Sequence, residues 1–186
     1  MEKAAFMAWL TRTAFLHYVM IQEKSSRLRT WNVVLIILTF GLTIVGTFLT
    51  RSGIINSVHA FTQSEIGPAF LIFLALILVI GIALLFKRIQ MLESEYKIES
   101  VLCRENVFLA QNVLLVGIAF TVLLGTTFPL LSEAVRGAKL SIQAPFFNTI
   151  TAPMGYALLL LMGVGMLIPW RKSSWEGLKG DFQNPV

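Results

Sequence analysis

The chain has 186 residues, of which 56% are hydrophobic and 13% are charged, and its formal net charge is +5. Apolar stretches of about 20 residues recur between polar breaks, which is the length that a bilayer requires of a helix. The composition excludes an ordinary soluble domain and predicts an all-α, polytopic integral membrane helical bundle. The basic residues lie beside the apolar stretches, so we interpret them as topology signals and expect lipid, not nucleic acid, as the surrounding partner.

Hydropathy predicts five transmembrane helices, with boundaries good to about three residues. They cover residues 4–23, 31–50, 67–86, 107–128 and 150–169. We expect the prolines at 68, 129, 145 and 153 to mark the ends of spans, where a helix tolerates a breaker best. Between the third and fourth spans, the spacing of Glu93 and Lys97 favours a short solvated helix.

The distribution of lysine and arginine predicts an orientation. Ten of the fifteen basic residues lie in segments 24–30, 87–106 and 170–186. By the positive-inside rule these segments face the cytoplasm, and the N-terminus, residues 51–66 and residues 129–149 lie outside. We therefore predict a transmembrane domain over residues 1–170, followed by a cytoplasmic tail over residues 171–186. Because the first span opens almost at Met1, we expect the chain to be a fragment of a longer architecture.

Two ionisable side chains lie inside the first predicted helix. Such groups are costly at membrane depth and usually face the interior of a bundle. His17 shares a helical face with Trp9 and Thr13, and a neutral imidazole is a common axial ligand of haem iron. A histidine hydrogen-bonded between helices explains the same pattern equally well. Arg12 could meet a carboxylate or a haem propionate, and a structural ion pair is the alternative.

The second histidine, His59, lies in the outer loop that follows the second span. Written as a helix, residues 54–61 gather their apolar side chains on one side, which is typical of a segment lying in the membrane interface. His59 falls at the edge of that side, and Arg51 and Ser52 add a cation and a hydroxyl suited to propionates. A solvated loop histidine beside a snorkelling arginine is the alternative, and the residues alone favour it.

The two histidines lie at different depths and therefore imply two separate sites. His17 lies about 13 residues into its span, roughly 20 Å deep, whereas His59 lies above the membrane surface. Each iron would need a second ligand that this chain lacks. There is no HExxH motif, carboxylate pair within a span or serine nucleophile elbow, and the single Cys103 gives no redox pair. Interhelical hydrogen bonding explains Asn106, Gln111 and Asn112 at the start of the fourth span.

Four segments resemble the cytochrome c maturation family CcmF and its nitrite-reductase-linked relatives, within the haem handling protein superfamily. They are "WLTRTAFLHYVMIQEKSS", "WNVVLIILTFGLTIVGTFLTRSGIINSVHAF", "GTTFPLL" and "APFFNT", and the similarity runs from about residue 2 to residue 170. The resemblance implies a haem lyase subunit that attaches haem, delivered by a chaperone, to CxxCH motifs of apocytochrome c outside the membrane. It implies that His59 is an axial ligand of the transferred haem and that His17 is a ligand of a separate haem b. A thiol-handling protein would be a further partner.

The sequence also departs from this family. Lys3, Ala5 and Ala8 stand where the family pattern has Asn, Ser and Pro, and the tryptophan-rich platform is absent from this chain. We therefore expect activity to require the missing N-terminal family segment or a separate chain that carries it. Two other interpretations are a noncatalytic haem transport or assembly component and an ordinary small-molecule membrane transporter.

Overall fold

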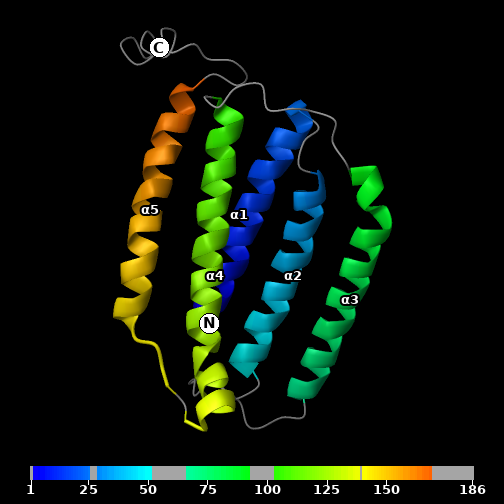
Figure 1. Cartoon of the computed structure of the whole chain (residues 1–186), viewed down its shortest axis with the longest axis vertical. Helices are drawn as coiled ribbons and strands as arrows, with labels where there is room; N and C mark the ends of the chain where they lie inside the picture. The colour runs from blue at the N-terminus through cyan, green and yellow to red at the C-terminus, as the bar shows by residue number, and fades with distance from the viewer. Residues whose placement is uncertain (1, 26–28, 52–65, 93–102, 139, 169–186) are drawn as a thin grey trace.

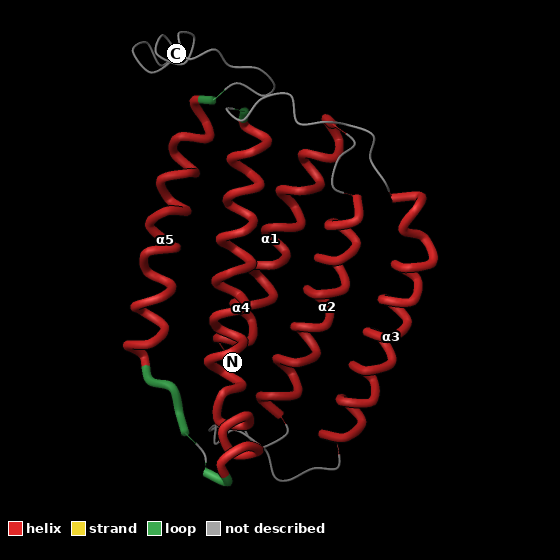
Figure 2. Tube along the Cα trace, viewed as in Figure 1, coloured by secondary structure: helices red, strands yellow, loops and turns green. Residues whose placement is uncertain are grey.

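The computed structural model describes residues 2–25, 29–51, 66–92, 103–138 and 140–168. Regular structure within these ranges is entirely helical (Figure 2). The helices are α1 (Glu2–Ser25), α2 (Arg29–Arg51), α3 (Ile66–Leu92), α4 (Arg104–Arg136) and α5 (Ala144–Leu167). All five are long and apolar enough to cross a membrane, which confirms the predicted all-α class and the five spans.

The helices stand side by side, and consecutive helices run in opposite directions (Figure 1). Contacts link α5 to α4, α4 to α1, α1 to α2, and α2 to α3. The core lies where α1, α2 and α4 meet, because apolar residues of α1 recur there every three or four positions. By contrast, no residue in the most apolar 18-residue stretch of α3 is buried. Helix α1 therefore lies at the centre, between α2 and α4, and α3 and α5 lie at the two edges.

Two of the four prolines do not mark helix ends, so that part of the sequence prediction is wrong. Pro129 lies inside α4 and Pro153 inside α5. Membrane helices tolerate internal proline because neighbouring groups satisfy the freed carbonyl. Pro145 lies in the first turn of α5, where its missing N–H is harmless. Helix α5 begins at Ala144, six residues before the predicted start at residue 150. The predicted short helix near Glu93 lies outside the described residues.

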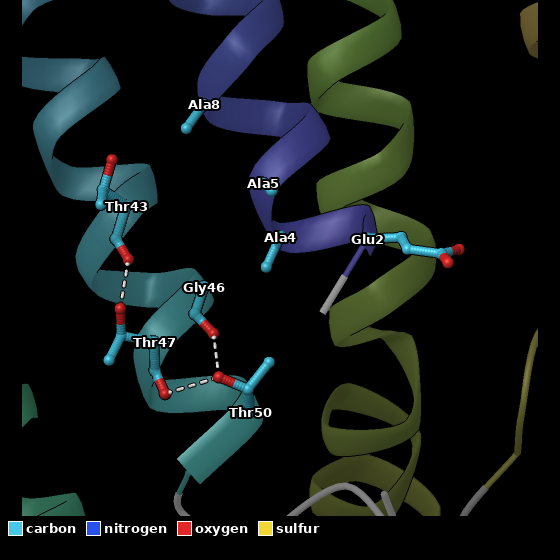
Figure 3. A pocket seen from close by; sticks show the side chains of 8 residues that line it. All are labelled: Glu2, Ala4, Ala5, Ala8, Thr43, Gly46, Thr47 and Thr50. Carbon is cyan, nitrogen blue, oxygen red and sulfur yellow. Dashed lines mark hydrogen bonds between the residues drawn. The ribbon is translucent and has the colours of Figure 1, made fainter. Parts of the chain in front are cut away.

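The first two helices pack most closely near the end of the bundle where α1 begins. A Cβ placed on Gly46 of α2 would lie 2.8 Å from the Cβ of Ala4 on α1, so only small residues permit this approach. Beside the contact is an open groove of about 480 Å³ (Figure 3). Its threonine hydroxyls bond to their own helix, as Thr47 does to the Thr43 carbonyl at 2.9 Å and Thr50 to the Gly46 carbonyl at 3.0 Å. The groove is lined by small and hydroxyl side chains and by Glu2, and His17 is not among its lining residues.

Candidate functional site

His17 of α1 is joined to α4 by a hydrogen bond inside the bundle. Its Nδ1 lies 3.0 Å from Oδ1 of Asn112. An amide oxygen only accepts hydrogen bonds, so His17 Nδ1 carries the hydrogen and donates it. A neutral imidazole held in this tautomer keeps its lone pair on Nε2, which is the nitrogen left to bind a metal.

The His17 ring lines a cavity of about 280 Å³ between α1, α4 and α5. The Phe108 ring of α4 lies beside the imidazole, with 5.1 Å between ring centroids and 51° between ring planes. On the α5 side the wall is formed by Met162, Gly165 and Met166. An apolar cavity with a few polar groups is the usual form of a small-molecule or cofactor site.

Asn112 is almost fully buried, with 1% of its surface exposed. Its Nδ2 has no hydrogen-bond acceptor among the residues that the structure describes. Tyr18, the residue after His17 on α1, is buried and lies close enough to interact with the same amide. The predicted interhelical hydrogen bond is therefore confirmed for Asn112. The sequence did not indicate that its partner is His17, because the two residues are 95 positions apart.

Arg104, at the start of α4, holds the end of α5 against the same cavity. Its Nε donates to the carbonyl oxygens of Gly165 at 2.9 Å and Ile168 at 3.0 Å, and its Nη2 donates to that of Met166 at 2.6 Å. The last carbonyls of a helix lack partners within the helix, and a cation is favourable there. The sequence analysis counted Arg104 only as a topology charge and missed this role, since no sequence signal links it to a helix end 61 to 64 residues away.

The structure does not bring the other predicted residues of α1 to His17. Arg12 is exposed and does not line the cavity. It is five residues before His17, and at about 100° per residue the two side chains point about 140° apart around the helix axis. Trp9 is 58% exposed, and the Thr13 hydroxyl bonds to the Trp9 carbonyl at 2.9 Å, not to His17. The predicted stripe of Trp9, Thr13 and His17 is therefore not a single buried site.

The proposed outer site falls largely on residues that the structure does not describe. His59 and Ser52 lie outside the described ranges, and Arg51 is the last residue of α2. That end of α2 lies at the same end of the bundle as the start of α1 (Figure 1). His17 is fifteen residues after Glu2 on α1, or about 22 Å along the helix axis. The depth predicted for His17 therefore fits its place on α1, and the depth predicted for His59 lies outside the described residues.

The fold and the His17 cavity define a multi-pass membrane protein with a partly buried histidine that lines a cavity between three helices. No family model matches the chain. It is 37% identical over 179 residues to the cytochrome c-type biogenesis protein CcmF of Pseudomonas fluorescens, covering 96% of this chain and 27% of that protein. It is 39% identical over 170 residues to CcmF of Escherichia coli, covering 91% and 26%. The cytochrome c-type biogenesis protein NrfE of Haemophilus influenzae is 31% identical over 177 residues, covering 94% and 27%.

A solved structure agrees with these sequence matches. The cytochrome c heme lyase CcmF superposes with a TM-score of 0.68 at 38% identity, covering 92% of this chain and 24% of that one. The chain belongs to the CcmF/CycK/Ccl1 family and spans about a quarter of the length of the curated relatives it matches. The resemblance found in the sequence is thereby confirmed.

Proposed function

We propose that the chain acts in cytochrome c-type biogenesis as a haem-binding membrane subunit of a haem lyase. The lyase would attach haem to CxxCH motifs of apocytochrome c on the outer side of the membrane. The observation that carries this proposal for the chain itself is the His17 imidazole, held by Asn112 in the tautomer that binds metals and facing an apolar cavity. The family matches supply the class of reaction.

The residues around His17 would hold part of a haem b. His17 would provide a ligand through Nε2, and Asn112 would hold the ring through Nδ1. Phe108 and Met162 give the cavity apolar lining, and Arg104 fixes the end of α5 that forms part of its wall. When bound, haem supplies an iron that exchanges single electrons, and the protein tunes that iron through its ligand and its surroundings.

We propose a second haem site on the outer side, with His59 as axial ligand of the haem being transferred. Arg51 and Ser52 would contact propionates there, whereas Arg12 is exposed on α1 and remains a weaker candidate for that role. The support is the position of Arg51 as the last residue of α2, away from the His17 cavity. One ligand within the membrane and one on its outer side would serve two haems with different roles.

The proposed setting is the bacterial inner membrane, with the N-terminus outside and the tail over residues 171–186 in the cytoplasm. This orientation is supported by the basic residues, because ten of fifteen lie on one predicted side. The proposed partners are the missing N-terminal family segment or a chain that carries it, a haem chaperone, apocytochrome c and its thiol-handling protein.

Optical spectra of protein purified from membranes test the haem sites. We expect His17→Ala to lose the membrane haem only, and His59→Ala to lose the transferred haem only. Thr13→Ala is the control for His17→Ala, since the Thr13 hydroxyl bonds only within α1. If neither histidine substitution changes haem content or cytochrome maturation, the site assignment is wrong.

Coexpression with the complementary family segment tests the reaction. Covalently attached haem in apocytochrome c supports a lyase subunit. Haem that is bound but never attached supports the noncatalytic haem transport or assembly function. A spectrum without a Soret band under all conditions supports a transporter unrelated to haem.

A further inference from the structure

One side of α1 is covered by neither of the helices that pack against it. Helix α1 contacts α2 and α4 through a buried stripe that includes Met7, Leu10 and Ala14. On the opposite side, exposed residues recur every three or four positions and define what we call the Arg12 face. It consists of Ala5, Trp9, Arg12, Leu16, Met20 and Glu23.

Arg12 lies near the middle of this face and near the middle of the helix. It is ten residues after Glu2 and thirteen before Ser25, or about 15 Å and 20 Å from the two ends. The hydrocarbon layer is about 30 Å thick, so a helix of this length that spans it carries Arg12 close to mid-depth. Arg12 makes no hydrogen bond or ion pair with any residue in the described part of the chain.

An arginine at this depth is poorly suited to lipid. Charged side chains inside membrane spans are rare and pair with one another or with backbone carbonyls. Helix α3 provides the contrast, because residues 67–86 contain no charged side chain and the exposed positions within this stretch are apolar. Val79 on α3 is 67% exposed and needs only lipid around it. The Arg12 face has a charge that lipid does not satisfy.

We propose that the Arg12 face docks a further membrane-spanning helix, which presents an aspartate or glutamate carboxylate to Arg12. The guanidinium offers several N–H donors in a planar fork that matches a carboxylate. Around it, Leu16 and Met20 are 50% and 43% exposed and supply apolar contact for a helix. The family relatives are about four times as long as the region matched here, so their architecture contains chain beyond these five helices. The proposal does not depend on haem binding at His17.

Photo-cross-linking in native membranes tests the surface directly. A benzophenone amino acid is placed at Leu16 or at Met20, and at Val79 on α3 as the lipid-facing control. We expect cross-links from Leu16 and Met20 to a peptide of a membrane-spanning segment that contains Asp or Glu, and cross-links from Val79 to lipid. The docking proposal is overturned if all three positions label lipid alike, or if the cross-linked peptide contains no acidic residue.

Substitutions of Arg12 test the charge pairing. If a carboxylate faces Arg12, Arg12→Leu leaves that carboxylate buried and unpaired, and the assembled complex should weaken on the order of thirtyfold. Arg12→Lys should retain part of the interaction, and Arg12→Glu should be rescued by exchanging the acidic residue of the cross-linked peptide for arginine. Unchanged or improved assembly of Arg12→Leu, as expected for a side chain in lipid, contradicts the proposal. A loss of haem without loss of the cross-link assigns Arg12 to a propionate and also contradicts it.

Discussion

Replacing Asn112 with leucine tests whether the hydrogen bond to His17 prepares the imidazole for iron. The substitution keeps the approximate side-chain volume and removes the oxygen that accepts the Nδ1 hydrogen at 3.0 Å. With Asn112 only 1% exposed, water cannot readily replace that acceptor. Loss of such a partner of a metal-binding histidine costs about 10- to 100-fold in affinity, or about 1.4 to 2.7 kcal/mol at 1.36 kcal/mol per tenfold. We expect haem affinity at His17 to fall within this range.

The assay is haem retention by protein purified from membranes, followed with the reduced-minus-oxidised spectrum and the iron–histidine stretching band in the Raman spectrum. Asn112→Asp keeps an acceptor oxygen and should bind haem better than Asn112→Leu. Asn32→Leu is the matched control, because Asn32 is also a buried amide and donates to Gln22 across the α1–α2 interface. It should leave the spectrum unchanged.

The reasoning about Asn112 is refuted if Asn112→Leu retains haem with wild-type affinity and an unchanged iron–histidine band. It is also refuted if Asn32→Leu causes the same loss, because the effect would then be one of general bundle stability. His17→Ala separates this failure from a failure of the proposed function. If His17→Ala retains the membrane haem, His17 is not its ligand, whatever Asn112 does.

Two further predictions concern packing around the core and the cavity. Gly46→Ala should destabilise the α1–α2 contact by about 1–3 kcal/mol, because the new Cβ would lie 2.8 Å from the Cβ of Ala4. Thermal denaturation in detergent should show this loss of stability. Gly163→Ala is the control and should not lower the stability, because a Cβ at Gly163 would have nothing within 4 Å. Arg104→Leu should loosen the end of α5 by removing charged donors from three carbonyls, at about 1.5–3 kcal/mol for each hydrogen bond lost. Amide hydrogen exchange should then rise in the last turn of α5, and unchanged protection there would show that Arg104 does not hold it.

The number of spans could be predicted because the bilayer imposes one physical requirement on every segment. Each apolar segment had to be long enough to cross the hydrocarbon layer and had to form its own backbone hydrogen bonds as a helix. Hydropathy therefore located five helices. Their ends were less predictable. Helix α4 has 33 residues, about 50 Å, and continues through Pro129 to Arg136. Hydropathy falls where a helix leaves the hydrocarbon, but the backbone can remain helical beyond that point.

The candidate site was predicted only in part. His17 stood out because an ionisable group inside an apolar run is unusual, and the same rule drew attention to Arg12. The structure separates the two: His17 lines a cavity, and Arg12 is exposed on another side of α1. Helical periodicity gives the angle between them but not which side faces protein. That choice depends on how α1 is rotated against α2 and α4.

By itself, the sequence determined the membrane class, the all-α architecture and the presence of one histidine within a span, because these follow from residue type and local spacing. Only the tertiary structure decided that Asn112 meets His17 and that Arg104 meets the end of α5. These partners lie 95 and 61 to 64 residues apart, so no local pattern joins them. Packing of α4 between α1 and α5 brings His17, Arg104 and the end of α5 to one cavity. A donor and an acceptor form a hydrogen bond only at about 3 Å, and the relative position of whole helices sets that distance.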